Sequence, residues 1–223
     1  MIPQIKNRIY GFFGRKENRT RLIMTIFGVV VSAVSVGFFR QAAFGTDPFQ
    51  CMCAGLDNVI PISFGTLYVI INLALLCVMF FTSRKFIGIA TFINMFLTGY
   101  IVEFSENTVH GIFGDPSMTA RIIYLIIGIA VMCLASAFYF TADLGVSTYD
   151  FIALRLAEIQ KKVPFRLIRI CTDLICVGIG FALGFVPGIG TIITAFFMGP
   201  LISFFIVRAA RPFLRRGSEQ KAG

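Results

Sequence analysis

The chain has 223 residues and a formal net charge of +9; 57% of its residues are hydrophobic, only 14% are charged, and its mean hydropathy is +0.85. A water-soluble domain of this size could not bury so much apolar surface, so the composition excludes a soluble protein and predicts one that resides in the lipid bilayer. The positive charge does not indicate nucleic-acid binding, because the basic residues stand in the gaps between apolar segments.

Residues 1–21 form a basic N-terminal segment with six Lys or Arg residues, which we expect on the cytoplasmic side. The apolar run after it is too long for a signal peptide and does not end at a small-residue cleavage site. We therefore expect no cleaved leader here.

Six apolar runs are long enough for a membrane-spanning helix, which needs about 20 residues. They cover residues 22–44, 64–82, 86–104, 120–142, 167–185 and 189–208. If the N-terminus is inside, 18 of the 20 Lys and Arg residues lie on the inner side, and only Arg40 and Arg121 lie outside. Because Lys and Arg accumulate in cytoplasmic loops, this count predicts that both termini are cytoplasmic.

Glycines recur when the chain is compared with itself at an offset of 100 residues. Gly28, Gly45, Gly88 and Gly99 coincide with Gly128, Gly145, Gly188 and Gly199. Each half would contain three spans, and an odd number of crossings makes the second half enter the membrane from the opposite side. The sequence therefore predicts an all-α polytopic membrane protein with six transmembrane helices and two short half-length helices, arranged as two inverted-topology repeats.

The predicted organisation places repeat 1 at residues 22–105 and repeat 2 at residues 120–208. An outer loop at 106–119 joins the repeats, and a basic cytoplasmic tail follows at 209–223.

The first short helix is predicted at residues 48–58, directly after the first span. Asp47 is a good N-cap, Pro48 suits the first helical position, and Gln50 stands where a capping box would be completed. Gly45 permits the chain reversal before the cap.

The second short helix is predicted at residues 148–160, where Ser147 and Asp150 offer the same capping device after Gly145. Two placements of the short helices stay open. As re-entrant helices, their positive N-termini would face each other near the midplane and form a site for an anion or a carboxylate group. As connectors, they would lie flat in opposite interfaces. The apolar first helix favours burial, and the charges at Arg155 and Glu158 favour an interface for the second.

A glycine–threonine motif opens the last span of each half, IGIAT at 87–91 and PGIGT at 187–191. The motif residues are Gly88, Thr91, Gly188, Gly190 and Thr191. Close helix packing and the lining of a solute path both explain such residues in a membrane bundle.

These motifs resemble those of the YczE/YyaS/YitT group of small bacterial integral membrane proteins. The resemblance is carried by the turn with Gly45, Pro48 and Phe49 and by the later Gly-x-Gly-Thr at 188–191, and it covers nearly the whole chain. It implies a multi-pass protein of the bacterial plasma membrane and names no substrate. The chain departs from the pattern at Thr148, where the first turn has Pro48.

Asp173 lies inside the fifth predicted span, and its counterpart in the first half is Asn72. A charged Asp there needs a partner or a hydrated cavity. Arg169, four residues earlier on the same helix face, would make a structural ion pair. A proton or cation site coupled to transport is the alternative.

The expected roles of four other polar residues are simpler. Asn94 and Thr194 coincide across the repeat and would bond neighbouring helices. Arg40 would extend to the outer headgroups, or else bind an anionic substrate beside Asp47. His110 is expected in a loop without a special role.

No phosphate-binding loop, HExxH motif or Ser/His/Asp set is present, so we expect no enzyme and no cofactor. Most of the six Cys residues fall in apolar segments and are expected to be small buried hydrophobes rather than metal ligands.

The leading functional hypothesis is secondary transport of a small anionic or zwitterionic solute through a site between the two repeats. The predicted binding residues are Asp47, Gln50, Asn72, Ser147, Asp150 and Asp173. The alternative is a non-transporting membrane assembly or regulatory protein. A homo-oligomer or a complex with another membrane protein stays open under both hypotheses.

Overall fold

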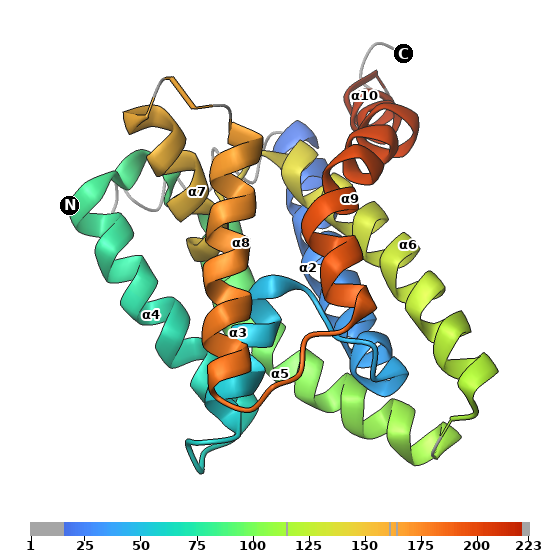
Figure 1. Ribbon diagram of the computed structural model, residues 1–223. Helices are drawn as coiled ribbons and strands as arrows, with labels where there is room; N and C mark the ends of the chain where they lie inside the picture. Colours follow the sequence, from blue (N-terminus) through green and yellow to red (C-terminus); the bar gives the residue numbers. More distant parts are fainter. Residues whose placement is uncertain (1–15, 115, 161, 164, 220–223) are drawn as a thin grey trace.

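The computed structural model describes residues 16–114, 116–160, 162–163 and 165–219, and every regular element in these ranges is helical (Figure 1). The longer helices are α2 (Lys16–Ala42), α4 (Phe64–Thr82), α5 (Ile89–Phe113), α6 (Met118–Ala142), α8 (Phe165–Ala182) and α9 (Ile189–Phe205). The shorter ones are α3 (Pro48–Asp57), α7 (Thr148–Ile159), α10 (Arg211–Glu219) and the turns η1 (Arg84–Phe86) and η2 (Ile206–Ala210). The predicted all-α class is confirmed for these ranges. Residues 1–15 of the predicted basic segment and 220–223 of the tail lie outside them.

Four helical stretches are long and apolar enough to cross a membrane: Asn18–Ala42, Phe64–Thr82, Met118–Ala142 and Ile189–Arg215. Large apolar side chains such as Phe81 and Ile126 are exposed on these helices, as expected for surfaces that face lipid. The helices therefore indicate a membrane protein.

The other two predicted spans, 86–104 and 167–185, correspond to the helices α5 and α8, which are more polar. Glu103 and Glu106 lie within α5, and α8 contains Arg169 and Asp173. By length and composition, four of the six predicted spans are thus supported.

The predicted outer loop at 106–119 is wrong for most of its length. Helix α5 continues to Phe113 and ends at Gly114, which has a positive φ of 58° and donates its N–H to the carbonyl of His110. Ser117 then caps α6 by accepting from the N–H of Ala120. His110 consequently lies in the last turn of α5 and not in a loop.

Two backbone turns at equivalent positions of the two halves each contact the other half. The carbonyl of Phe44 accepts a hydrogen bond from Gly190 N at 2.7 Å, and the carbonyl of Leu144 accepts one from Ala90 N at 3.1 Å. Each turn therefore packs on the first residues of the helix that ends the other half.

Glycines are required where these turns meet the helix starts. Gly45 and Gly145 have φ values of +90° and +116°, which side chains disfavour. A Cβ on Gly188 would collide with the carbonyl of Phe44, and a Cβ on Gly88 would collide with that of Leu144. Each predicted glycine–threonine motif thus contacts the turn that precedes the short helix of the other half.

The short helices α3 and α7 both begin in the middle of the molecule and extend toward opposite ends (Figure 1). The rings of Phe49 and Tyr149, in their first turns, stack with centroids 4.7 Å apart and planes inclined by 17°. Both helices end one residue before the predicted boundary. Their N-termini therefore meet inside the helical bundle.

Candidate functional site

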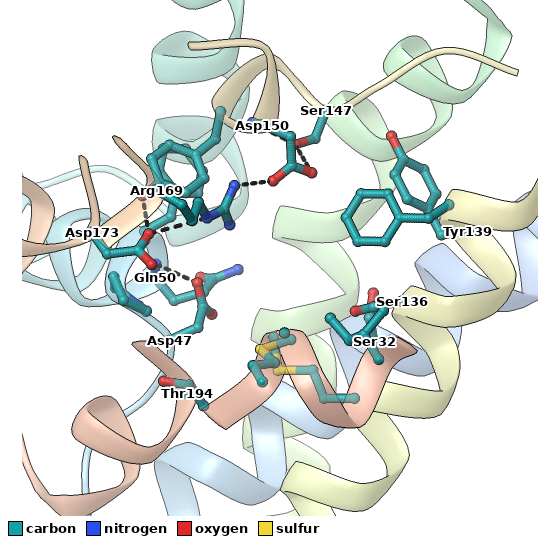
Figure 2. A pocket seen from close by; sticks show the side chains of 18 of the residues that line it. Ser32, Asp47, Gln50, Ser136, Tyr139, Ser147, Asp150, Arg169, Asp173 and Thr194 are labelled. Carbon is teal, nitrogen blue, oxygen red and sulfur yellow. Dashed lines mark hydrogen bonds and ion pairs between the residues drawn. The ribbon is translucent and has the colours of Figure 1, made fainter. Parts of the chain in front are cut away.

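A cavity of about 720 Å³ lies where α3 and α7 begin (Figure 2). Its wall is built from residues of α2, α4, α5, α6, α8 and α9 and from the starts of the short helices. The six residues predicted to bind a solute, Asp47, Gln50, Asn72, Ser147, Asp150 and Asp173, all line it. The fold thus brings together residues from both halves of the chain, and their binding role stays a prediction.

Asp47 caps α3 as predicted, because its Oδ1 accepts the N–H of Gln50 at 3.3 Å. Its second oxygen, Oδ2, is buried and has no hydrogen-bond partner in the described ranges. The predicted capping box is wrong: Gln50 Oε1 is also buried without a partner there, since this side chain lines the cavity instead of reaching back to the cap.

Ser147 caps α7 as predicted. Its Oγ accepts the N–H of Asp150 at 3.0 Å and donates its own hydrogen to Asp150 Oδ2 at 2.7 Å. The first turn of α7 is therefore stabilised by one hydrogen bond to the backbone and one between side chains.

Arg169 on α8 lies between two carboxylates (Figure 2). It forms an ion pair with Asp150, and its Nε is 3.4 Å from Asp173 Oδ1. Its guanidinium lies 4.6 Å from the ring centre of Tyr149, whose hydroxyl donates to Asp173. The predicted contact of Arg169 with Asp173 is confirmed, whereas the link to Asp150 and the role of Tyr149 were missed.

Asn72 on α4 makes one side-chain hydrogen bond to another helix and one within its own helix. Its Oδ1 accepts from the hydroxyl of Thr148 at 2.6 Å, and its Nδ2 donates to the carbonyl of Tyr68 at 2.7 Å. Asn72 thus ties α4 to the start of α7 beside the cavity.

The two polar residues predicted to bond neighbouring helices behave differently. Tyr68 of α4 contacts Asn94 Oδ1 of α5 at 3.5 Å, so this pair does link two helices. Thr194 instead donates to the carbonyl of Thr191 in its own helix at 3.0 Å. The prediction for Thr194 is wrong, since a backbone carbonyl one turn earlier is nearer than any partner on another helix.

The wall opposite Arg169 holds three polar residues that the sequence reading missed, Ser32, Ser136 and Tyr139 (Figure 2). Tyr139 is only 7% exposed, and its hydroxyl has no partner in the part of the chain that the structure describes. The spacing of Ser136 and Tyr139, three residues apart in an apolar helix, was the available signal for a polar helix face.

Arg40 does not extend to the outer surface and does not line the cavity with Asp47, so both expectations for it are wrong. It forms an ion pair with Glu106, and its guanidinium lies 4.0 Å from the centre of the Phe64 ring. The reason is the extra length of α5, which carries Glu106 alongside α2.

A group of exposed charges joins the two halves at the far end of α7. Glu158 forms ion pairs with Lys85 of η1 and with Arg155 of its own helix, the latter at 3.1 Å. The hydrogen bond from Lys85 is the main reason that the pKa of Glu158 lies below its usual range.

Four of the cysteines, Cys51, Cys53, Cys133 and Cys176, are buried free thiols, whereas Cys77 and Cys171 are exposed. Among the described residues, no group of three His, Cys, Asp or Glu side chains is placed to hold a metal ion. The buried four fit the interpretation of cysteine as a small hydrophobe.

Comparison with known proteins adds a family without an assigned activity. A family model described as "Family of unknown function (DUF6198)" matches residues 19–207. An uncharacterized protein YyaS of Bacillus subtilis is 25% identical over 194 residues, covering 85% of this chain and 96% of the relative. An uncharacterized protein of Haemophilus influenzae is 22% identical over 186 residues, covering 83% of each chain. No solved structure matches the chain.

Proposed function

From the premise that this chain belongs to the DUF6198 family of unknown function, with YyaS among its relatives as the sequence resemblance predicted, we propose that it is a small-solute secondary transporter of the bacterial plasma membrane. The observation that carries the proposal is the cavity of about 720 Å³ at which both short helices begin. A space of this size, largely apolar with a few convergent polar groups, is typical of small-molecule sites.

In this proposal the chain consists of two inverted repeats of three spans, α2, α4 and α5 followed by α6, α8 and α9. The exchanged contacts support it: Phe44 with Gly190 and Leu144 with Ala90 are the same pair of positions with the halves interchanged. The stacking of Phe49 on Tyr149 joins two equivalent residues, as expected at a pseudo-two-fold axis. In such transporters the site lies between the repeats and is built from the ends of discontinuous helices.

The charges of α8 are compatible with a membrane span under this arrangement. Charged residues inside membranes face the bundle interior or a hydrated cavity and pair with one another. Arg169 and Asp173 do both, because they line the cavity and lie within ion-pair distance. Alternating access would then expose the cavity to each side of the membrane in turn.

The test is the access of water-soluble thiol reagents to the cavity from each side. In a background without native cysteines, Ser32→Cys and Ser136→Cys place near-isosteric reporters on the cavity wall opposite Arg169. We expect a membrane-impermeant reagent to label both from the outside in whole cells and from the inside in inverted vesicles. Ser35→Cys is the matched control, because Ser35 is fully buried in the same helix as Ser32 and does not line the cavity.

Labelling of the two reporters from one side only would contradict transport. That result would describe a one-sided pocket and favour the alternative, a non-transporting assembly or regulatory protein. Equal labelling of Ser35→Cys would mean that the reagent enters a loosened protein, and the transport assignment would then lose its support.

A further inference from the structure

The cavity is acidic. Among the described residues that line it, Asp47, Asp150 and Asp173 are carboxylates and Arg169 is the basic side chain. Arg169 is already held by Asp150 and Asp173. Asp47 makes no ion pair within the described ranges, so among the three carboxylates it is the one without a basic partner.

The two helix N-termini do not restore positive charge to the cavity. The positive end of a helix attracts an anion through its free N–H groups. Here Asp47 accepts the N–H of Gln50 and Ser147 accepts the N–H of Asp150, so both ends are capped from within the chain. An anionic solute would therefore meet capped helix ends and surplus carboxylates, which repel it.

Acceptor atoms without partners belong to side chains that line the same cavity. Asp47 Oδ2 and Gln50 Oε1 are buried and unpartnered in the described structure, and Gln50 is only 4% exposed. The hydroxyl of Tyr139, which also has no partner in the described structure, belongs to the opposite wall of the cavity (Figure 2). An ammonium group carries three donors and no acceptor, so it matches a carboxylate oxygen and an amide oxygen.

The remaining wall is largely apolar. Val29, Ala33, Met132, Phe140 and Met198 contribute to it. A solute that satisfies the acceptors at one end would place an apolar body against these side chains.

We propose that the cavity binds a solute with a protonated amine and an apolar body, and that Asp47 and Gln50 hold the ammonium group. The inference rests on the proposed function for the place of binding. It assigns a cationic solute in place of an anionic one, because a positive charge would pair with the Asp47 carboxylate. Asp150 and Asp173 instead form ion pairs with Arg169.

The test uses three six-carbon probes that differ only in the head group: hexylamine, hexanoate and hexanol. The purified full chain in neutral detergent is titrated with each probe at pH 7 by calorimetry and by thermal unfolding. We expect hexylamine to bind and to raise the melting temperature with concentration, as a native-state ligand does. Hexanoate and hexanol should leave the melting temperature unchanged.

The decisive variant is Asp47→Asn, which keeps an N-cap acceptor and removes the charge. We expect it to weaken hexylamine binding about tenfold or more, by loss of a charge-assisted hydrogen bond. Asp57→Asn, at the other end of α3 and outside the cavity lining, should bind like the wild type. If Asp47→Asn does not fold, Asp47→Ser supplies a second capping residue without charge.

Three results would overturn the inference: wild-type protein that does not bind hexylamine, hexanoate that binds more tightly, or Asp47→Asn that binds hexylamine as the wild type does. The inference and the transport proposal can fail separately. Amine binding together with one-sided labelling at Ser32 and Ser136 would defeat transport alone. Two-sided labelling without amine binding would defeat the amine inference alone.

Discussion

At the scale of single residues, Arg169 has the most consequential environment, because its single positive charge lies between two carboxylates, Asp150 and Asp173. Its i,i+4 relation to Asp173 was predictable, since the two lie on one helix face. Its pairing with Asp150 joins two helices and was not predictable from either segment. Tyr149 completes the site, because its ring contacts the guanidinium and its hydroxyl donates to Asp173.

Removing the charge of Arg169 is expected to destabilise the protein. Arg169→Gln leaves Asp150 and Asp173 without a cation, and we expect a loss of roughly 1–3 kcal/mol in the free energy of unfolding, measured by thermal or chemical denaturation in detergent. The expected loss of unfolding free energy is smaller than for a fully buried ion pair, because the Arg169 side chain is 32% exposed. The double variant with Asp173→Asn should recover part of the loss. A neutral Arg169→Gln would contradict a structural ion pair and favour the coupling-site hypothesis for Asp173.

Glycine at the turn before α3 is required by backbone conformation as well as by space. Gly45→Ala should cost roughly 1–3 kcal/mol of unfolding free energy, because φ is +90° and the added Cβ would meet the backbone of Gly188. Gly199→Ala is the matched control: a Cβ there meets nothing within 4 Å, and alanine favours a helix by up to about 1 kcal/mol. Equal melting temperatures for the two variants would refute the turn argument.

At the scale of elements, the short helices α3 and α7 matter most for the candidate site, because their first residues line the cavity. Their caps, starts and ends are local properties, since a capping residue bonds N–H groups within three positions of itself. Their placement is a property of the whole bundle. The sequence left re-entrant and interfacial positions open, and the stacking of Phe49 on Tyr149 supports the re-entrant one.

Cross-linking distinguishes the two placements. In the background without native cysteines, Phe49→Cys with Tyr149→Cys should be joined by a short bifunctional thiol reagent, detected as a change in mobility after cleavage between the halves. Helices lying in opposite interfaces would be separated by about 30 Å of hydrocarbon, and the reagent could not bridge them. Phe49→Cys paired with Lys162→Cys, at an exposed residue after α7, controls for non-specific joining.

The outer part of α5 shows how an element boundary was missed. Glu103, Glu106 and the polar residues that follow lower the hydropathy, so an apolar-run criterion ends the span at 104. Hydrogen bonding continues the helix until Gly114, where a positive φ ends it. Eight residues of helix, 106–113, were therefore read as loop, and the ion pair of Arg40 with Glu106 was missed.

At the scale of the whole molecule, the topology of α5 and α8 is the central question, because length and composition alone support four spans. Six spans place Asn107 outside and Lys162 inside; four spans, without α5 and α8, reverse both. We expect cysteines at these two exposed positions to be labelled from the outside and the inside, respectively.

Two positions serve as controls, because both topologies agree on them. Ile62→Cys should be labelled from the outside and Arg84→Cys from the inside, and both residues are exposed. The reversed pattern at Asn107 and Lys162, with the controls as expected, would refute the inverted repeats and the transport mechanism built on them.

The sequence by itself determined the membrane class, the position of most helices, the caps at Asp47 and Ser147, and six of the polar residues that line the cavity. These follow from hydropathy and from hydrogen bonds between residues close in the chain. Only the tertiary structure decided which of them are occupied by partners within the protein. The ion pair of Arg40 with Glu106 spans 66 positions and the bond of Thr148 with Asn72 spans 76, so packing alone brings the partners together. By the same packing, Asp173 accepts a hydrogen bond from Tyr149, whereas Asp47 Oδ2 has no partner among the described residues, and no local sequence pattern predicts this difference.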